Sequence, residues 1–277
     1  MIGGFAWKAQ YVDKNGYIYT GDDAQYNLQT DAPAPYHAEL APVTKQFDCG
    51  QCHTTGYVST SEGGAAQDGL AGMTGEFFAA GVQCEACHGM GSFHVNSRSA
   101  SDIILDRTAK ACATCHSRAD GQRIAAADGF IMNYTQYDEM KAAKHQNLSC
   151  VDCHDPHVSV KHGETGGIVK ACTTCHEGIK NPTHKGADCI TCHMPHATKS
   201  AVAVNKYVAD VQTHIFKINT SALGNMFSDN GTVANGAEGV TLGYVCYQCH
   251  KDDNNIGGPN SKKSLGILAG RAQGYHE

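Results

Sequence analysis

Strict alternation of apolar and other side chains occurs near the start of the chain. The apolar members flank a short polar segment, 13–16, and are Phe5, Trp7, Ala9, Tyr11, Tyr17 and Tyr19. That segment reads Asp-Lys-Asn-Gly, and an Asn-Gly pair readily adopts the positive φ angles of a tight hairpin turn. Alternation on both sides of such a turn predicts a small N-terminal β-hairpin.

Elsewhere the hydrophobic pattern supports only short elements. Three segments are compatible with short helices, 102–118, 135–147 and 264–275, and Ser264 is a suitable N-cap for the last. Segments 56–76 and 228–239 are rich in Gly, Ser and Asn, which predicts surface loops. The pattern therefore predicts a chain that is mostly coil, with few short α-helices and one small hairpin.

A single motif, Cys-x-x-Cys-His, accounts for every cysteine in the chain. It occurs seven times, and the fourteen cysteines are Cys49, Cys52, Cys84, Cys87, Cys112, Cys115, Cys150, Cys153, Cys172, Cys175, Cys189, Cys192, Cys246 and Cys249. The histidines that follow are His53, His88, His116, His154, His176, His193 and His250. This is the attachment motif of haem c, in which two thioethers hold the porphyrin and the next residue, His, is the proximal iron ligand. The sequence predicts seven haems c per chain.

Two other interpretations of Cys-x-x-Cys fit less well. A zinc site takes two such pairs per metal, so seven pairs would leave one over, and zinc gives no reason for a His after every second Cys. A disulfide framework would not keep a two-residue spacing seven times.

The size of the chain limits how the haems can be enclosed. Seven haems in 277 residues leave about 40 residues each (277/7), too few to wrap every porphyrin separately. The haems must share a core, and their apolar faces replace part of the usual aliphatic one. We therefore expect one multihaem domain, 1–277, with a lead-in at 1–48, a seven-haem core at 49–250 and a helix and tail at 251–277.

Charge and hydropathy exclude some partners. The formal net charge is −6, and haem propionates would add to it, which argues against binding to nucleic acid or an anionic membrane. No run of 18 apolar residues occurs, so no membrane span is expected. The first residues do not resemble a signal peptide, yet haem c is attached outside the cytoplasm. We expect an extracellular or cell-surface location, with the periplasm as alternative, and a sequence that begins inside a longer precursor.

Nine further histidines are available as distal iron ligands. Spacing favours His145 and His184, each five residues before a motif, and Pro156 stiffens the chain beside His157. His94 follows a Gly-Met-Gly turn, and His214 lies in an apolar setting where a free imidazole would need a partner. His276 completes this set. Three others compete for the seventh place, and we favour His37 over His196 and the polar-flanked His162.

These residues resemble a known family. The chain is similar to the large multihaem cytochromes c of metal-reducing and related anaerobic bacteria, in the doubled-CxxCH and cytochrome c554-like superfamily. The similar stretches are 3–9, 52–57, 81–89, 153–157, 192–195 and 213–219. The resemblance implies bis-His haems in a closely stacked chain, and it strengthens the assignment of His94, His214 and His276. Relatives commonly carry a further haem-bearing segment before the first stretch, which leaves the distal ligand of the first haem open.

Two classes of function follow. The first is an electron conduit in respiratory or extracellular electron transfer, without catalytic residues. Its partners would be other cytochromes or extracellular acceptors, and the resemblance implies that it could act as a homo-oligomer or filament subunit. The second is a reductase of a small oxyanion such as nitrite, hydroxylamine or tetrathionate, which needs one haem with an open iron position. We favour the conduit, because all seven motifs end in His and the spare histidines suffice for every iron.

Overall fold

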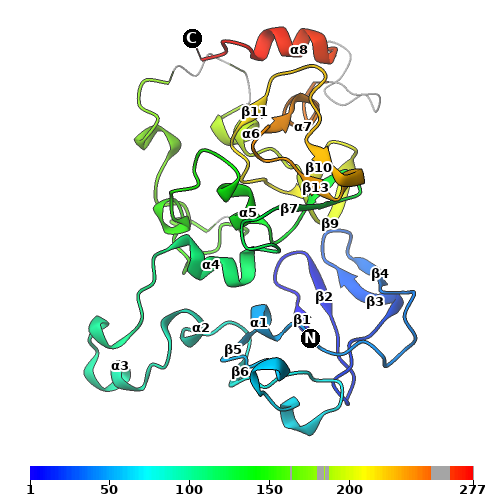
Figure 1. Cartoon of the computed structure of the whole chain (residues 1–277), viewed down its shortest axis with the longest axis vertical. Helices are drawn as coiled ribbons and strands as arrows, with labels where there is room; N and C mark the ends of the chain where they lie inside the picture. Colours follow the sequence, from blue (N-terminus) through cyan, green and yellow to red (C-terminus); the bar gives the residue numbers. More distant parts are fainter. Residues whose placement is uncertain (163, 180–183, 185–186, 251–262, 277) are drawn as a thin grey trace. The chain divides into compact units, whose positions relative to one another are not determined.

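The structure is a computed structural model that describes residues 1–162, 164–179, 184, 187–250 and 263–276. The chain divides into two compact units, 1–107 and 108–277. The described residues are mostly coil with short helices and several small sheets (Figure 1), as the sequence predicts.

The first unit begins with a four-stranded antiparallel sheet (Figure 1). Its strands, in sheet order, are β1 (Ile2–Gly3), β2 (Lys8–Gln10), β3 (Gly21–Asn27) and β4 (Ala32–Tyr36). Strands β2 and β3 form a hairpin around the predicted turn, and β1 and β4 extend it on either side. Tyr17 and Tyr19, expected in the second strand, instead lie in the connection before β3, where Val12 and Ile18 form an isolated bridge.

The hairpin turn depends on a glycine. Gly16 has φ of +89°, and a Cβ there would lie 2.3 Å from the Cγ of Met73. Asp13 stabilises the same turn, because its Oδ1 accepts hydrogen bonds from the backbone N–H groups of Asn15 and Tyr17, both at 2.9 Å. The turn brings Ile18 into a small core with Ile2 and Phe47, against which Cys49 of the first motif packs. The sheet thus supports the first haem motif.

The rest of the first unit carries two motifs on short elements. In chain order these elements are α1 (Gly50–His53), β5 (Thr54–Thr55), η1 (Thr60–Glu62), η2 (Gln67–Gly69), β6 (Ala79–Ala80), α2 (Glu85–His88), α3 (Ser92–Ser97) and η3 (Ala100–Asp102). Strands β5 and β6 pair directly after the first motif and just before the second. This pairing places the first two motifs side by side.

The second unit contains a six-stranded mixed sheet that the hydrophobic pattern did not predict. Its order is β10 (Val208–Val211), β9 (Thr198–Asn205), β8 (Phe130–Met132), β7 (Ile124–Ala127), β13 (Val233–Ala234) and β12 (Phe227–Ser228). Only β8 and β9 pair in parallel, and the long connection between them carries three motifs. The segment 228–239 was predicted to be a loop, but it contains β13 and the end of β12, which pair with each other.

Short helices and one two-stranded pairing complete the second unit. They are α4 (Ala109–His116), α5 (Gln136–Lys141), η4 (Cys150–Asp152), η5 (Cys172–Thr174), α6 (Cys189–His193), β11 (Ile218–Asn219), η6 (Asp229–Gly231), β14 (Val240–Thr241), α7 (Leu242–Cys246) and α8 (Leu265–Ala272). The three helices predicted from sequence are present as α4, α5 and α8, the first two much shorter than expected. Ser264 caps α8, because its side chain accepts a hydrogen bond from the N–H of Ile267.

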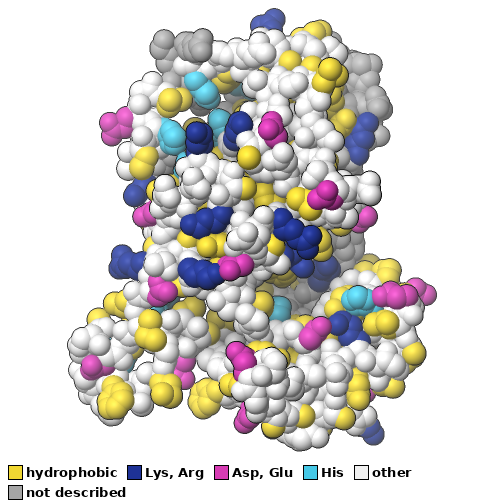
Figure 2. Space-filling view, viewed as in Figure 1, with side chains coloured by type: hydrophobic (Ala, Val, Ile, Leu, Met, Phe, Trp, Pro, Cys, Tyr) yellow, Lys and Arg dark blue, Asp and Glu magenta, His cyan; other side chains and the backbone are white. Residues whose placement is uncertain are grey.

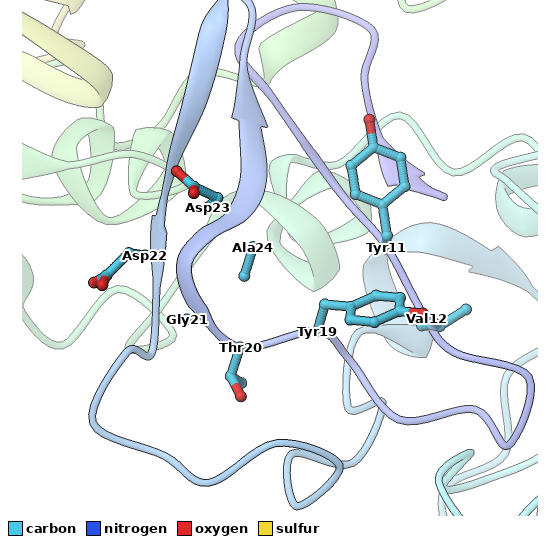
Figure 3. A pocket seen from close by; sticks show the side chains of 8 residues that line it. All are labelled: Tyr11, Val12, Tyr19, Thr20, Gly21, Asp22, Asp23 and Ala24. Carbon is cyan, nitrogen blue, oxygen red and sulfur yellow. The ribbon is translucent and has the colours of Figure 1, made fainter.

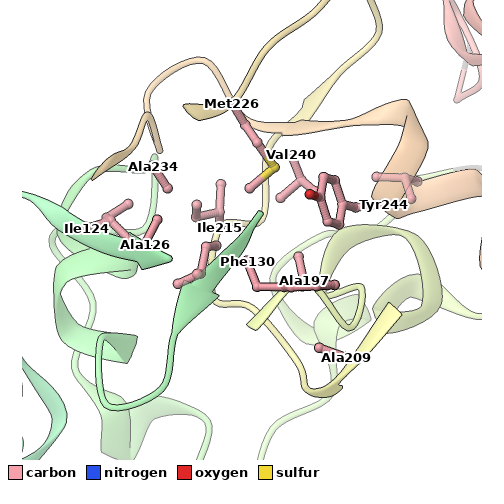
Figure 4. Packing of buried hydrophobic residues seen from close by; sticks show 12 residues of the cluster. Ile124, Ala126, Phe130, Ala197, Ala209, Ile215, Met226, Ala234, Val240 and Tyr244 are labelled. Carbon is pink, nitrogen blue, oxygen red and sulfur yellow. The ribbon is translucent and has the colours of Figure 1, made fainter. Parts of the chain in front are cut away.

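An aliphatic core lies beside the six-stranded sheet (Figure 4). Ile124 and Phe130 from the sheet pack there with Ile215 and Val240, which come from loop and edge segments. The partly buried thiols of the last two motifs, from α6 and α7, pack against this cluster. The second unit therefore has an ordinary hydrophobic core next to its haem motifs, in addition to any apolar surface that the haems provide.

Candidate functional site

Each Cys-x-x-Cys-His motif forms one helical turn. The N–H of the histidine donates to the carbonyl oxygen of the first cysteine, at 3.0 Å in His53 and 2.9 Å in His154. Such a bond spans four residues, so both thiols and the imidazole lie on the same face of the turn. A porphyrin on that face is within reach of two sulfur atoms and one nitrogen at once, which is why the motif needs this spacing.

The thiols are accessible for covalent attachment. All fourteen cysteines lie among the described residues, and none of them is fully buried. Unligated cysteine is normally among the most buried residue types, because its side chain behaves as a small hydrophobe. Fourteen accessible thiols in seven turns therefore fit the attachment of haem c better than a packing role.

Consecutive motifs of the second unit are neighbours in space. A hydrogen bond that the Cys150 thiol donates to Cys112 raises the pKa of Cys150, and Cys172 lies close enough to Cys189 for a similar contact. Burial raises the pKa of Cys246 to about 12, with a further contribution from the nearby Cys192. Three pairs of motifs are thus adjacent: the third with the fourth, the fifth with the sixth, and the sixth with the seventh. Charge interactions between Cys153 and the fifth motif join the fourth to the fifth, so the five motifs follow one another in sequence order.

Four proximal histidines of the second unit each face a distal candidate. The ring centroids are 5.9 Å apart in His145–His176, 6.2 Å in His154–His214, 5.8 Å in His184–His250 and 5.8 Å in His193–His276. Metal–imidazole bonds are about 2 Å long, so two imidazoles on opposite sides of one iron have ring centres about 6 Å apart. All four pairs have the separation of bis-His ligation, and every one combines a motif histidine with a histidine predicted from sequence to be distal.

The environment of these rings favours the neutral imidazole, which is the form that binds metal. Burial lowers the pKa of His214 to about 4, together with smaller contributions from the neighbouring His154 and His116. Burial likewise lowers the pKa of His145 and of His154, because an imidazolium loses hydration when it leaves water. These rings are therefore ready to act as ligands at neutral pH.

Hydrogen bonds at Nδ1 orient several other rings. Nδ1 of His88 lies 2.8 Å from the carbonyl oxygen of Ile104, and Nδ1 of His193 lies 2.7 Å from that of Phe216. An imidazole that donates Nδ1–H to a carbonyl keeps the lone pair of Nε2 free for a metal, the arrangement typical of metal-binding histidines. The same atom is bonded in His37 to Glu39, in His94 to Ser99, in His116 to Gln136 and in His157 to Asp155.

Some predicted ligands are not brought into a pair. Among the described residues, the ring of His53 contacts no other imidazole, and the same holds for His94 and His116. His37 was favoured for the seventh distal place, and in the described residues its ring lies edge-on to Tyr36. Its assignment, like those of His94 and His157, stays a prediction.

The two histidines that were ranked below His37 differ in exposure. His162 lies on the surface, as its polar neighbours in the sequence suggest. His196 is half-buried, and this burial lowers its pKa. His196 is therefore closer in character to the paired histidines than His162 is.

Sequence reasoning missed two buried acids beside the site. Asp138 and Glu139, adjacent in α5, are 1% and 0% exposed, and both bond to segments that carry haem-site histidines. Nothing in the local sequence distinguishes this Asp-Glu pair from an exposed one. Their partners are far away in the chain, so only the folded structure reveals them.

One pocket lies away from all of these residues. It has a volume of about 590 Å³ and lies on the N-terminal sheet, where Tyr11, Tyr19, Asp22 and Asp23 are among its lining residues (Figure 3). Neither cysteine nor histidine lines it, so it is not part of the haem site. Histidine side chains do reach the surface elsewhere on the face shown in Figure 2.

Comparisons with known proteins agree with this chemistry. Residues 21–89 match the family model described as cytochrome c554 and c-prime, and residues 77–177 match that of cytochrome c3. No curated protein matches the chain. With its seven motifs, the chain is a c-type cytochrome. More narrowly, it is a multihaem cytochrome whose segment 21–177 is similar to the c554 and c3 families, which confirms the resemblance seen in the sequence.

Three solved structures resemble the chain at low identity. The undecahaem cytochrome from the S-layer of Carboxydothermus ferrireducens is 17% identical, with a TM-score of 0.39 over 71% of this chain and 44% of that chain. The octahaem sulfite reductase MccA of Wolinella succinogenes is 18% identical, with a TM-score of 0.49 over 90% of this chain and 48% of that chain. The outer cell wall cytochrome OcwA is 15% identical, with a TM-score of 0.45 over 77% of this chain and 66% of that chain. The chain thus spans about half to two thirds of the length of these proteins.

Proposed function

We propose that the protein is a seven-haem electron conduit rather than an enzyme. The observation that carries this proposal is the set of four imidazole pairs at 5.8 to 6.2 Å along a row of adjacent motifs. When bound, each haem supplies a one-electron iron couple whose potential depends on its axial ligands and surroundings. An iron with two imidazoles has no open position for a substrate, so such a site transfers electrons and binds nothing.

The residues of the chain have three tasks in this function. The cysteines hold each porphyrin at a fixed place, and the motif turns hold consecutive porphyrins close to one another. The paired histidines would hold four irons between them: His145 with His176, His214 with His154, His184 with His250, and His276 with His193. The burial of His214 would exclude water from that iron, which would reduce the reorganisation that electron transfer requires.

The remaining three irons would be those below His53, His88 and His116. We propose His37, His94 and His157 as their distal ligands, with His196 and then His162 as substitutes. An assembly could complete the first of these sites, because His53 contacts no other imidazole in the described structure. A histidine from a second copy, placed head to tail, would satisfy that iron and extend the row of haems into a filament.

Location and partners follow from this chemistry. Haem c is attached outside the cytoplasm, so we propose an extracellular or cell-surface protein whose partners are other cytochromes or extracellular electron acceptors. In the described part of the chain, no helix has the length and apolar character needed to cross a membrane.

A second candidate function rests on His53 and His116, the motif histidines whose rings contact no other imidazole among the described residues. If the iron below His53 or His116 has no distal imidazole, it could reduce a small oxyanion such as nitrite, hydroxylamine or tetrathionate. The sulfite reductase among the similar structures is a protein with that kind of activity, although the likeness is too low to support the assignment.

Two measurements test the conduit. The intact mass, together with a pyridine haemochrome assay, should give seven haems per chain, and six or fewer would refute the count. EPR of the oxidised protein should show only low-spin iron, whereas a stoichiometric high-spin signal from one haem would favour the reductase.

Negative-stain imaging and light scattering separate a filament from a monomer, and a monodisperse monomer at every concentration would exclude the assembly.

A further inference from the structure

Helix α5 contains two adjacent carboxyl groups that are almost completely buried. Asp138 is 1% exposed and Glu139 is 0% exposed, and neither forms an ion pair among the described residues. Burying a carboxylate without a cation is costly unless hydrogen bonds replace the lost water. Two such groups in one short helix therefore indicate strong hydrogen bonds to specific partners.

Asp138 binds the segment that follows the third motif. Its Oδ1 accepts hydrogen bonds from the hydroxyl of Ser117 and from the N–H of Gly121, the latter at 2.7 Å. Its Oδ2 accepts from the N–H of Arg118 at 2.8 Å. Gln136, two residues earlier in α5, reaches Nδ1 of His116 through its Oε1 at 3.3 Å. One end of α5 thus holds both the ring of His116 and the backbone directly after it.

Glu139 binds a different segment. Its Oε2 accepts hydrogen bonds from the hydroxyl of Thr213 and, at 2.6 Å, from the N–H of His214. Its Oε1 accepts from the hydroxyl of Thr135 at 2.8 Å. The bond to His214 is made at the backbone of a paired histidine itself, so the position of that imidazole depends directly on the carboxyl group.

We propose that α5 is a positioning element for two neighbouring haem sites: Gln136 and Asp138 fix the proximal His116, and Glu139 fixes the distal His214. The inference rests on the proposed function, in which both histidines bind iron. The two sites are close, because α4, which ends at His116, contacts η4, which begins the motif of His154, the partner of His214. A single short helix therefore sets the ligand geometry of two consecutive haems. Asp138 and Glu139 act through the histidines and contact no iron.

The test separates the hydrogen-bond acceptor from the charge and from general stability. Glu139→Leu has a similar volume and no acceptor, so the His214 segment is released. Glu139→Gln keeps one oxygen for the His214 N–H. Its amide can donate to the Thr135 hydroxyl, and the proton of that hydroxyl then binds the carbonyl oxygen of Met132, which lies 2.7 Å away. EPR of the oxidised holoprotein at pH 8 is the readout, with haem count and circular dichroism as checks on assembly.

The expected result is a change in one low-spin signal of the seven in Glu139→Leu, by loss to high spin or by a shift of its g values. Glu139→Gln should restore the parental signal. Parental spectra in Glu139→Leu, or equal changes in the Leu and Gln variants, would overturn the proposal. If Glu139→Leu does not assemble, Thr213→Val removes one donor to Glu139 and the acceptor of the Ile215 N–H, and it should shift one low-spin signal. An unchanged spectrum there would also overturn the proposal.

A matched control is available in the same unit. Asp210 accepts hydrogen bonds from the backbone N–H groups of Ser200, Ala201 and Val202, so it is also a carboxylate that holds a backbone segment, here in strand β9, through several amides. It makes no hydrogen bond to a histidine of the four pairs. Asp210→Asn should leave every haem signal in place, and a change equal to that of Glu139→Leu would overturn the positioning role. A high-spin signal already present in the parent would instead refute the proposed function.

Discussion

Replacement of His145 by alanine should convert one haem of the seven from six- to five-coordinate. The ring of His145 lies 5.9 Å from that of His176, so it is the only imidazole in the described structure placed to be the second ligand of that iron. The change therefore affects one iron in seven, about 14% of the total, whereas the other six keep their ligands. EPR spin quantitation, calibrated against total haem, measures this fraction directly.

The stability cost of the same change can be worked out separately. Nδ1 of His145 is buried without a hydrogen-bond partner, so its removal breaks no hydrogen bond at that atom. The ring does pack edge-on against Phe216 with centroids 4.4 Å apart. Such an aromatic pair contributes about 1 kcal/mol. In a unit of the size of 108–277 that loss lowers Tm by about 2–4 °C, and the lost iron bond adds to it.

Phe216→Leu is the control for His145→Ala, because it removes the aromatic contact and leaves the imidazole in place. It should reproduce the packing part of the Tm change without any high-spin iron. If His145→Ala remains entirely low-spin with seven haems bound, the identification of imidazole pairs with axial ligands is wrong.

Three further predictions concern stability. Ser264→Ala removes the cap of α8 and should cost about 1 kcal/mol, seen as a lower denaturation midpoint, with a selective effect on the haem served by His276, which follows that helix. Gly16→Ala forces a side chain into a left-handed backbone and a crowded space, so the first unit should lose about 1–3 kcal/mol, while Gly63→Ala, also at positive φ but with open space around it, should cost less. Burial raises the pKa of Tyr244 to about 12, so the folded state favours the neutral phenol. The free energy of unfolding should therefore fall by about 2 kcal/mol as pH rises from 10 to 12. Tyr244→Phe should abolish that pH dependence, as measured by urea titrations.

Local features were well predicted from the sequence. The motif turns need only five consecutive residues, and the i to i+4 bond within them places both thiols and the imidazole on one face wherever they occur. The N-terminal hairpin and the Ser264 cap were predictable for the same reason, since Asn-Gly geometry and a serine N-cap act over a few residues. The distal candidates named from the sequence, His145, His184, His214 and His276, each lie beside a motif imidazole in the structure, and their role as iron ligands stays a prediction.

Which histidine meets which motif was decided only by the tertiary structure. His214 reaches His154 because the mixed sheet and α5 bring the segment after β10 back toward the fourth motif, and no local signal records that return. The sheet itself was missed because five of its strands have only two to four residues and come from distant parts of the chain, while the eight-residue β9 shows no alternating burial. Asp138 and Glu139 look like ordinary helix-surface acids until their partners at Ser117 and His214 are in place. Amino-acid order determined the number and local shape of the haem sites, because covalent attachment needs only neighbours in sequence. Axial pairing needs neighbours in space, and only the fold supplies those.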